Sequence, residues 1–336
     1  SNSFCTLLAC ANFPMPRGQV SFAQHFGAIY GDRWSTLLEA MEKPQPKVAL
    51  WNRHTKLAKP SVDASGMEEF SVDSGLPCLR SADPSTPELA PPPRDEHGVP
   101  AYYLLDLASV LVAEAVRPEP FHKVLDLCAA PGGKSVALSQ YLTMGGSLTC
   151  NEMNGERNKR LRRTLQEYIP VKDTHEVTIT QKDGTRWHMP ATFDRVLIDA
   201  PCSSERHLVQ QTDGLGKWTP KVTEEQAATQ LPLLLRGLET LKVGGVLVYS
   251  TCSISPAEND DLVAAALKRT RVGAELVPTV LSGAEATPLG ASMHLPDTAA
   301  GMGPMYCCVL KRVAETRADS DDDDSSIGTA SDDESD

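Results

Sequence analysis

Two cysteines stand where two apolar runs of this 336-residue chain end. Cys202 closes the sequence DAPC after the run 195–198, and Cys252 follows the run 246–250 in the sequence YSTC. If these runs are neighbouring parallel strands, both thiols lie in the crevice at one sheet edge. A single cysteine is most often a buried packing residue. Two cysteines at equivalent strand ends favour a shared chemical site.

A pair of thiols suits substitution at an electron-poor ring carbon. C5 of cytosine does not attack a methyl group unaided, but addition of a thiolate to C6 turns C5 into a nucleophilic enamine carbon. Cysteine fits this step because it is nucleophilic and also a workable leaving group. A second group must then help to remove the C5 proton and release the product. The base must also leave its stack to be reached.

Residues 124–135, with the sequence VLDLCAAPGGKS, predict a buried strand, a tight loop of small residues and a helix. Such a loop begins the nucleotide site of a doubly wound sheet, because small side chains let a ligand approach the backbone. The segment is not a P-loop, since Cys128 stands where that motif needs its first glycine. A Gly-Gly turn that only starts a helix is the plain alternative.

Three carboxylates follow the ends of successive predicted strands, namely Glu152, Asp183 and Asp199. Each alone is more often a helix cap or a turn residue. Their shared position predicts a ring of carboxylates around one crevice. Negative charge there disfavours a pyrophosphate and favours a nucleoside with a cationic tail. S-adenosylmethionine, a sulfonium, fits that description better than NAD.

The motifs DLCAAPGGKS, DGTRW, DAPCSSERH and YSTCSISPAEND resemble those of the Sun-domain RNA cytosine-5 methyltransferases, over residues 102–312. The resemblance implies that Cys252 is the nucleophile and that Cys202 assists product release. It also implies S-adenosylmethionine as cofactor. The residues expected to bind it, some of which also help to place the base, are Pro131, Gly132, Gly133, Lys134, Glu152, Arg157, Asp183, Gly184 and Asp199.

The segment FAQHFGAIYGDRWSTLL resembles the mitochondrial ribosomal-RNA branch of that family. This likeness implies a mitochondrial enzyme that acts on ribosomal RNA in the assembling mitochondrial ribosomal subunit. It also implies a partner of the mTERF helical-repeat type that supplies RNA-binding surface. Two other functions stay open: an assembly factor that acts mainly by binding, and a transfer-RNA methyltransferase with the same chemistry.

Alternating apolar runs and helical patterns predict an α/β fold, a doubly wound, mostly parallel Rossmann-like methyltransferase sheet. Its elements are expected as strands at 123–127, 147–151, 176–180, 195–198, 246–250, 275–277 and 305–311, and as helices at 101–116, 133–142, 156–168, 223–241 and 256–270.

The first hundred residues predict a small helical extension followed by a linker. Residues 22–41 have helical spacing, with an aromatic stripe that should pack on the main domain: Phe22, Phe26, Tyr30 and Trp34. A short strand is expected at 48–51. Residues 60–98, rich in Pro, Ser, Asp and Glu, predict a linker or irregular loop. The expected domains are 1–100, 101–313 and 314–336.

Charge is unevenly distributed along the chain. The net charge is −12, and residues 319–336 contain nine acidic residues and no basic one, so the remainder carries −3. We expect this acidic tail to be disordered. A nearly neutral body does not exclude an RNA substrate, but it argues against a protein that binds nucleic acid by charge alone.

The nine cysteines are scattered without CxxC pairs, which predicts reduced thiols and no metal site. Cys307 and Cys308 stand in the apolar run MYCCVL and should be core residues. No apolar run approaches the ~20 residues that span a bilayer, so no membrane association is expected. The chain starts at Ser1 without an Arg-rich leader, so a targeting segment is absent, removed or not included.

Overall fold

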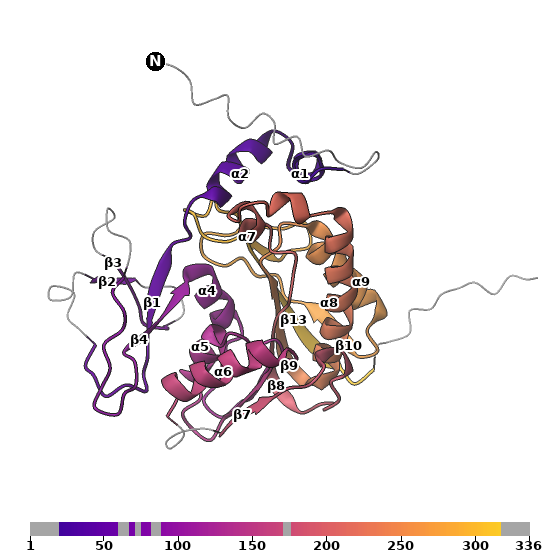
Figure 1. Ribbon diagram of the computed structural model, residues 1–336. Helices are drawn as coiled ribbons and strands as arrows, with labels where there is room; N and C mark the ends of the chain where they lie inside the picture. The colour runs from indigo at the N-terminus through magenta and orange to yellow at the C-terminus, as the bar shows by residue number, and fades with distance from the viewer. Residues whose placement is uncertain (1–19, 60–66, 71–74, 82–88, 171–175, 317–336) are drawn as a thin grey trace, which may run out of the picture.

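The computed structural model describes residues 20–59, 67–70, 75–81, 89–170 and 176–316. Within these ranges a nine-stranded sheet forms the centre of the molecule (Figure 1). In spatial order its strands are β11 (Glu285–Ala286), β12 (Ser292–His294), β13 (Met305–Ala314), β9 (Leu241–Thr251), β8 (Phe193–Asp199), β5 (Lys123–Asp126), β6 (Ser147–Asn151) and β7 (Glu176–Thr180), with β10 (Gly273–Leu276) paired to β13.

The five strands β5 to β9 run parallel to one another, and β13 closes the row antiparallel to β9. Chain order doubles back at β5, which lies between β6 and β8. A ligand crevice in such a sheet opens beyond the carboxyl ends of the strands at this point. The predicted doubly wound, mostly parallel α/β sheet is confirmed.

Helices cover both faces of the sheet. One face carries α4 (Leu107–Ala115), α5 (Gly133–Ser139) and α6 (Gly155–Tyr168), and the other carries α8 (Pro220–Thr240) and α9 (Asp260–Arg269) (Figure 1). Side chains along β8 pack alternately into the two helix layers, because successive side chains of a strand point to opposite faces of the sheet. Val196 and Ile198 pack in the α8 and α9 core, whereas Leu197 packs in the α5 and α6 core.

A second sheet precedes the main one in the chain. Its four strands are antiparallel, in the order β2 (Met67–Phe70), β3 (Cys78–Ser81), β1 (Lys47–Trp51) and β4 (Tyr102–Asp106). The strand expected at 48–51 is confirmed as β1. Val48, Leu50 and Cys78 on one face of this sheet pack against Leu107 and Val110 of α4. The small sheet is thereby fixed to the helix layer beside the crevice.

The single helix expected at 101–116 is wrong in its first part. Residues Tyr102–Asp106 form β4 and pair along their whole length with β1, and α4 starts only at Leu107. Pairing with a strand about fifty residues earlier overrides the helical pattern, as tertiary context often does. Asp106 marks the true start, since its side chain caps α4 by accepting a hydrogen bond from Ser109 N.

The linker expected at 60–98 is likewise corrected, because β2 and β3 lie inside it. Strand β3 pairs with β1, which precedes the predicted linker, and with β2, its neighbour in the chain. In this segment Leu76, Cys78 and Leu79 are buried. Residues 60–66, 71–74 and 82–88 lie outside the described ranges. Strands β1 and β4 are bonded across the predicted domain division at residue 101, and that division stays a prediction.

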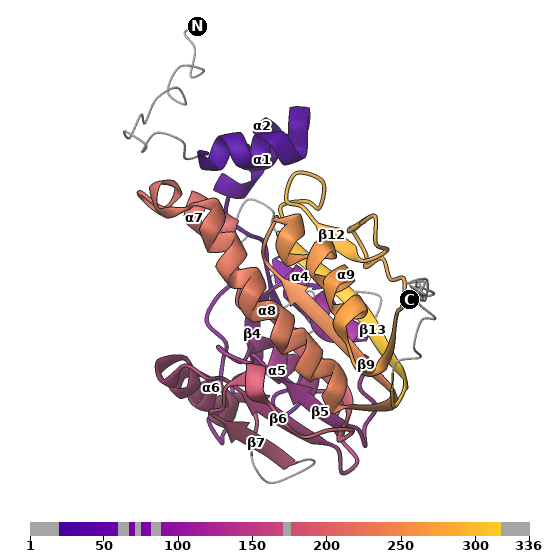
Figure 2. The ribbon, with the colours of Figure 1, turned by 90° about the vertical axis from the view of Figure 1, so that its right-hand side faces the viewer.

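The aromatic N-terminal segment forms two helices rather than one. Helix α1 (Phe22–Tyr30) ends at Gly31, whose φ of +55° favours glycine, and a 3₁₀ turn, η2 (Gly31–Arg33), leads into α2 (Trp34–Glu42). The stripe packs on the main domain as predicted: Phe22 and Phe26 are buried against Trp218, with ring centroids 5.3 and 5.2 Å away. Figure 2 shows both helices at the end of the molecule where α7 (Glu205–Val209) lies.

The remaining short elements are the 3₁₀ turns η3 (Gly184–Arg186), η4 (Leu215–Lys217) and η5 (Pro256–Glu258). Among the described helices, none combines the length and the hydropathy that crossing a membrane requires. The acidic tail expected to be disordered, residues 319–336, lies outside the described ranges.

Candidate active site

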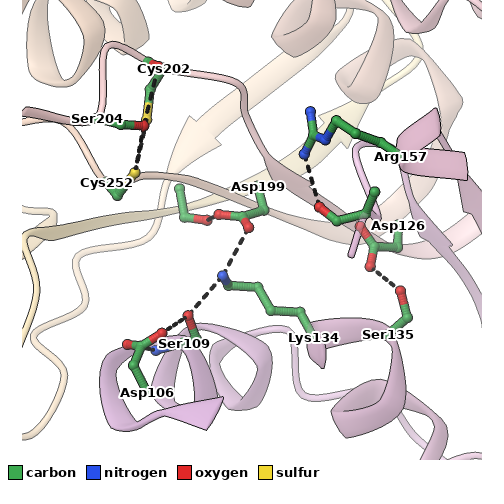
Figure 3. Close-up of polar contacts among 12 residues, drawn as sticks. Asp106, Ser109, Asp126, Lys134, Ser135, Arg157, Asp199, Cys202, Ser204 and Cys252 are labelled. Carbon is green, nitrogen blue, oxygen red and sulfur yellow. Dashed lines mark hydrogen bonds and ion pairs between the residues drawn. The ribbon is translucent and has the colours of Figure 1, made fainter. Parts of the chain in front are cut away.

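The two predicted cysteines meet in the structure. Cys202 lies three residues beyond the end of β8, and Cys252 directly follows β9. Their Sγ atoms are 3.1 Å apart (Figure 3). Both side chains are half-buried and line a cleft of about 570 Å³. Parallel pairing of Asp199 with Ser250 brings the two loops side by side.

Ser204 completes the contact between the sulfurs. Its Oγ lies 3.4 Å from Cys202 Sγ and 3.2 Å from Cys252 Sγ. The backbone of Ser204 is left-handed, with φ +53° and ψ +54°, a conformation that costs energy in a residue other than glycine. The tight turn places this hydroxyl between the thiols and begins α7 one residue later.

The two thiols differ in their affinity for a proton. The pKa of Cys252 lies below its ordinary value because Cys202 and the Ser204 hydroxyl hydrogen-bond to its thiolate, and these contacts outweigh burial. The pKa of Cys202 lies well above its ordinary value because of the contact with Cys252 and because of burial. Cys252 is therefore the more readily ionised sulfur, and the thiolate is the nucleophilic form.

A lysine crosses the cleft to the strand that precedes Cys202. Lys134 Nζ donates to Asp199 Oδ2 at 2.8 Å and to Ser109 Oγ at 2.9 Å (Figure 3). Ser250 Oγ donates to the other oxygen of Asp199 at 3.0 Å. Burial favours loss of the lysine proton, but the charges of Asp199 and Asp106 outweigh it and raise the pKa of Lys134. Lys134 is therefore a fixed cation between α5 and β8.

The small-residue loop forms the second wall. A smaller cleft of about 210 Å³ is lined by Tyr103 and Gly133, and by Pro131, Lys134 and Asp199, which line the larger cleft as well. Gly132 has φ +115°, a conformation that glycine adopts without penalty. Below the loop, Ser135 Oγ donates to Asp126 at 2.6 Å, and burial raises the pKa of Asp126 to about 7.

Arg157 ties α6 to this loop. Its guanidinium donates to the carbonyl of Ala130 at 2.9 Å and lies 3.4 Å from the carboxylate of Glu152. Glu152 is buried at the end of β6 and accepts a hydrogen bond from Asn154 N. Arg157 lines the larger cleft, whereas Glu152 lines neither cleft.

Asp183 and Gly184 lie at the end of β7, the far strand of the predicted ring, and line neither cleft. Asp183 caps η3 by accepting from the N–H of Thr185. A Cβ on Gly184 would lie 2.7 Å from Cδ2 of Leu233 in α8, so a larger residue there would have to displace this side chain. Gly132 also lines neither cleft, and its missing side chain makes room for Thr164 of α6.

Several residues of the cleft were not found by sequence reasoning. Asp106 and Ser109 were assigned to one helix, although an aspartate directly before an apolar helical run is a typical N-cap signal. Ser204, Arg206 and His207 also line the larger cleft. They stand in the motif DAPCSSERH, but only Asp199 and Cys202 of this motif were given a role.

Comparison with known proteins assigns the chain to a family. A sequence profile of the family described as 16S rRNA methyltransferase RsmB/F matches residues 113–311. The chain belongs to this family, the Sun-domain RNA cytosine-5 methyltransferases. The resemblance seen in the four motifs is thereby confirmed.

Two relatives of the family match most of the chain. The mouse (Mus musculus) mitochondrial tRNA (cytosine(34)-C(5))-methyltransferase is 33% identical over 324 residues, which cover 88% of this chain and 90% of the relative. The bovine (Bos taurus) 5-cytosine rRNA methyltransferase NSUN4 is 31% identical over 326 residues, or 90% of this chain and 84% of the relative.

Solved structures agree on the fold. A methyltransferase homologue from Pyrococcus horikoshii superposes with a TM-score of 0.66 at 25% identity, covering 87% of this chain and 96% of that one. NSun6 from the same organism, solved with SFG, has a TM-score of 0.66 at 16% identity and covers 89% of this chain and 98% of its own. The latter likeness concerns the fold alone.

Proposed function

We propose that this chain methylates C5 of a cytosine in RNA through a covalent bond between Cys252 and C6 of the base, with Cys202 assisting release. The observation that carries the proposal is the 3.1 Å contact between the two sulfurs in one cleft, where the pKa of Cys252 is lowered and that of Cys202 is raised. A cation, Lys134, and a carboxylate, Asp199, stand in the same cleft and supply polar groups for a base.

The protonation of the two thiols supports this division of roles. The thiolate of Cys252 donates an electron pair to C6, and the pair of the C5–C6 double bond moves onto C5. Once its sulfur is bonded to carbon, Cys252 carries no charge, so the repulsion that raises the pKa of Cys202 is removed. Cys202 then becomes able to help remove the C5 proton, and the S–C6 bond breaks with its electrons returning to Cys252.

We further propose that S-adenosylmethionine binds at the carboxyl ends of β5 to β8, and when bound it supplies the methyl group. The proposed residues form a loop of small and cationic side chains with carboxylates on the neighbouring strands: Pro131, Gly132, Gly133, Lys134, Glu152, Arg157, Asp183, Gly184 and Asp199. The cleft of about 210 Å³ beside the loop supports this fit for the four of these residues that line it, Pro131, Gly133, Lys134 and Asp199. The NSun6 structure with SFG, an analogue of S-adenosylmethionine, belongs to a protein of the same fold.

For the substrate, we favour ribosomal RNA in the mitochondrion, as part of ribosome assembly and with an mTERF-type partner. The bovine NSUN4 relative is named as an rRNA enzyme, and a body of charge −3 benefits from a partner that supplies positive surface. A transfer-RNA substrate is the second candidate, favoured by the mouse mitochondrial tRNA enzyme at 33% identity.

Bisulfite sequencing of RNA from cells with and without the protein tests both substrates at once. We expect one cytosine of mitochondrial ribosomal RNA to lose its methyl group when the protein is absent. Loss at a transfer RNA alone would replace the first candidate by the second. An unchanged pattern in both RNA classes would contradict the proposed activity.

Two variants test the roles of the sulfurs. Cys252→Ala should abolish transfer of labelled methyl to RNA, and Cys202→Ala should accumulate a protein–RNA adduct that survives denaturing electrophoresis. Cys78→Ala, a buried cysteine of the small sheet, is the control and should do neither. If ribosomes assemble normally with Cys252→Ala but fail without the protein, an essential role in binding would be favoured over one in catalysis.

A further inference from the structure

Two glutamates are buried behind the cysteines. Glu205 is the first residue of α7, in the loop that follows Cys202, and Glu258 is the last residue of η5, in the loop that follows Cys252. Both are fully buried. Within the described residues, their hydrogen-bond donors are hydroxyls and N–H groups of neutral residues rather than cationic side chains.

The two carboxylates share a pair of serine hydroxyls. Ser253 Oγ lies 2.8 Å from Glu258 Oε1 and 3.2 Å from Glu205 Oε1. Ser203 Oγ contacts the same two carboxylate oxygens, and the two hydroxyls are 3.0 Å apart. Ser203 belongs to the loop of Cys202 and Ser253 to the loop of Cys252. The four oxygens therefore form a closed ring that joins the two loops.

The ring has too few hydroxyl protons for two ionised carboxylates. Each serine contributes one proton, whereas the ring contains four contacts between a hydroxyl and a carboxylate. A proton on one carboxyl group fills a third contact and removes one of two like charges in a site without water-like screening. Two carboxylates that share a buried site commonly hold one proton between them.

The remaining donors indicate which group stays charged. Glu258 Oε2 accepts from Ser203 N at 3.1 Å and from Gln230 Nε2 at 2.7 Å. Glu205 Oε2 accepts from Ile254 N at 3.0 Å, and the Glu205 carboxylate also interacts with its own main-chain N–H. Glu258, whose second oxygen accepts from two other residues, is the better site for the charge. Consistently, burial and the charge of Glu258 raise the pKa of Glu205 to about 7.

We propose that Glu205 and Glu258 are a proton-sharing carboxylate pair that ties the loop of Cys202 to the loop of Cys252 through Ser203 and Ser253. They are positioning residues, because neither glutamate lines either of the two clefts. Their consequence for methyl transfer rests on the proposed function, since it is the alignment of the two sulfurs that they maintain.

Among the residues that the structure describes, the groups around the pair do not supply a competing countercharge. The phenol of Tyr30 from α1 donates to Ile254 O, and that of Tyr249 from β9 donates to Glu258 O, both at 2.8 Å. Arg206, the neighbour of Glu205, directs its guanidinium to main-chain carbonyls of Lys43, Gly301 and Gly303. The thiols of Cys202 and Cys252 face the pair from the cleft side and are destabilised as anions by it.

The test measures how fast the two sulfurs form a disulfide with the thiol oxidant diamide, because this rate reports their alignment without RNA. In this step both thiols lose a proton and an electron, and diamide is reduced to the hydrazine. Glu205→Gln keeps the size and hydrogen bonding of a neutral carboxyl group, and Glu205→Leu removes both. We expect the rate of disulfide formation in Glu205→Gln to stay within about threefold of the wild-type rate. In Glu205→Leu the rate should fall roughly 10- to 100-fold.

The pH dependence separates a proton-sharing pair from a merely structural contact. As the pH rises from about 6 to about 8, wild type loses the shared proton, since the pKa of Glu205 is about 7. Its disulfide rate should therefore rise less with pH than that of Glu205→Gln, which has no such proton. Glu39→Gln, an exposed surface change, is the matched control and should follow wild type.

Two results would overturn the proposal. One is a folded Glu205→Leu protein with the wild-type disulfide rate, and the other is the same pH profile for wild type and Glu205→Gln. If Glu205→Leu does not fold, the pH comparison still decides. Methyl transfer to the chosen RNA is measured in parallel. Failure of methyl transfer with a normal disulfide rate would contradict the proposed function but not the proton-sharing carboxylate pair.

Discussion

Cys202 and Cys252 lie at the carboxyl ends of β8 and β9, whereas Cys307 and Cys308 lie inside β13, the strand next to β9. The interior pair faces opposite cores, Cys307 toward α5 and α6 and Cys308 toward α8 and α9. Burial raises the pKa of both interior thiols, that of Cys308 to about 12. Cysteine is therefore a packing residue in mid-strand, whereas Cys252 at the strand end is readily ionised, because a turn brings donors to its sulfur.

The largest expected difference is in reactivity. Iodoacetamide should label Cys252 in the native protein, because its pKa lies below the ordinary value. Cys307 and Cys308 should react at least about 10³-fold more slowly, since they need the sheet to open first. Peptide mass spectrometry over time measures all three rates in one sample. Comparable labelling of Cys307 and Cys252 in the native protein would remove the distinction between edge and interior.

A second prediction compares the two ends of the same strands. Lys134 pairs with Asp199 at the carboxyl end of β8, and Lys242 pairs with Asp194 near its amino end, at 2.7 Å. Lys134→Met should reduce methyl transfer about 10²-fold, because it removes a fixed charge from the cleft. The matched control Lys242→Met should stay within about twofold, because this partly exposed pair lies away from the cleft and contributes little. Equal losses in both variants would show that the lysines act through stability.

A third prediction concerns stability. Cys308→Ser places a hydroxyl in an apolar core and should lower the free energy of unfolding by about 1–3 kcal/mol. Cys202→Ser, at the half-buried edge beside Ser204, should change it by less than about 1 kcal/mol. Urea denaturation of the two variants and wild type checks this. A larger loss for Cys202→Ser than for Cys308→Ser would mean that the edge is as tightly packed as the interior.

The edge and interior of the main sheet were largely predictable from the sequence. Strands β6 and β7 begin and end where apolar patterning predicted, and the sequences DAPC and YSTC placed both cysteines at strand ends. These features depend on short stretches of chain, so local patterns suffice. The small-residue loop was located for the same reason.

Features that depend on distant partners could not be predicted. Strand β4 looks helical until its pairing with β1 is known, and β2 and β3 are hidden in a polar, proline-rich segment. The buried pair Glu205 and Glu258 appears only when the loops after β8 and β9 come together. A glutamate in a loop is ordinarily a solvated residue, and no spacing rule marks these two as buried.

The smallest expected effect concerns the serine that bridges the edge cysteines. Ser204 Oγ lies 3.2 Å from Cys252 Sγ, and loss of this donor should raise the pKa of Cys252. Ser204→Gly removes the hydroxyl and also relieves the left-handed backbone, because glycine adopts φ +53° freely. We expect alkylation of Cys252 near neutral pH to slow about three- to tenfold, with no loss of stability.

Ser204→Ala separates the hydroxyl from the backbone. Alanine also lacks the donor, so it should slow alkylation of Cys252 as much as glycine does, but it retains the left-handed strain and gains nothing in stability. Alkylation rates of both variants across the pH range, with unfolding free energies from urea, give the two effects independently. If Ser204→Gly alkylates at the wild-type rate, the low pKa of Cys252 depends on Cys202 alone, and the edge differs from the interior by one contact rather than two.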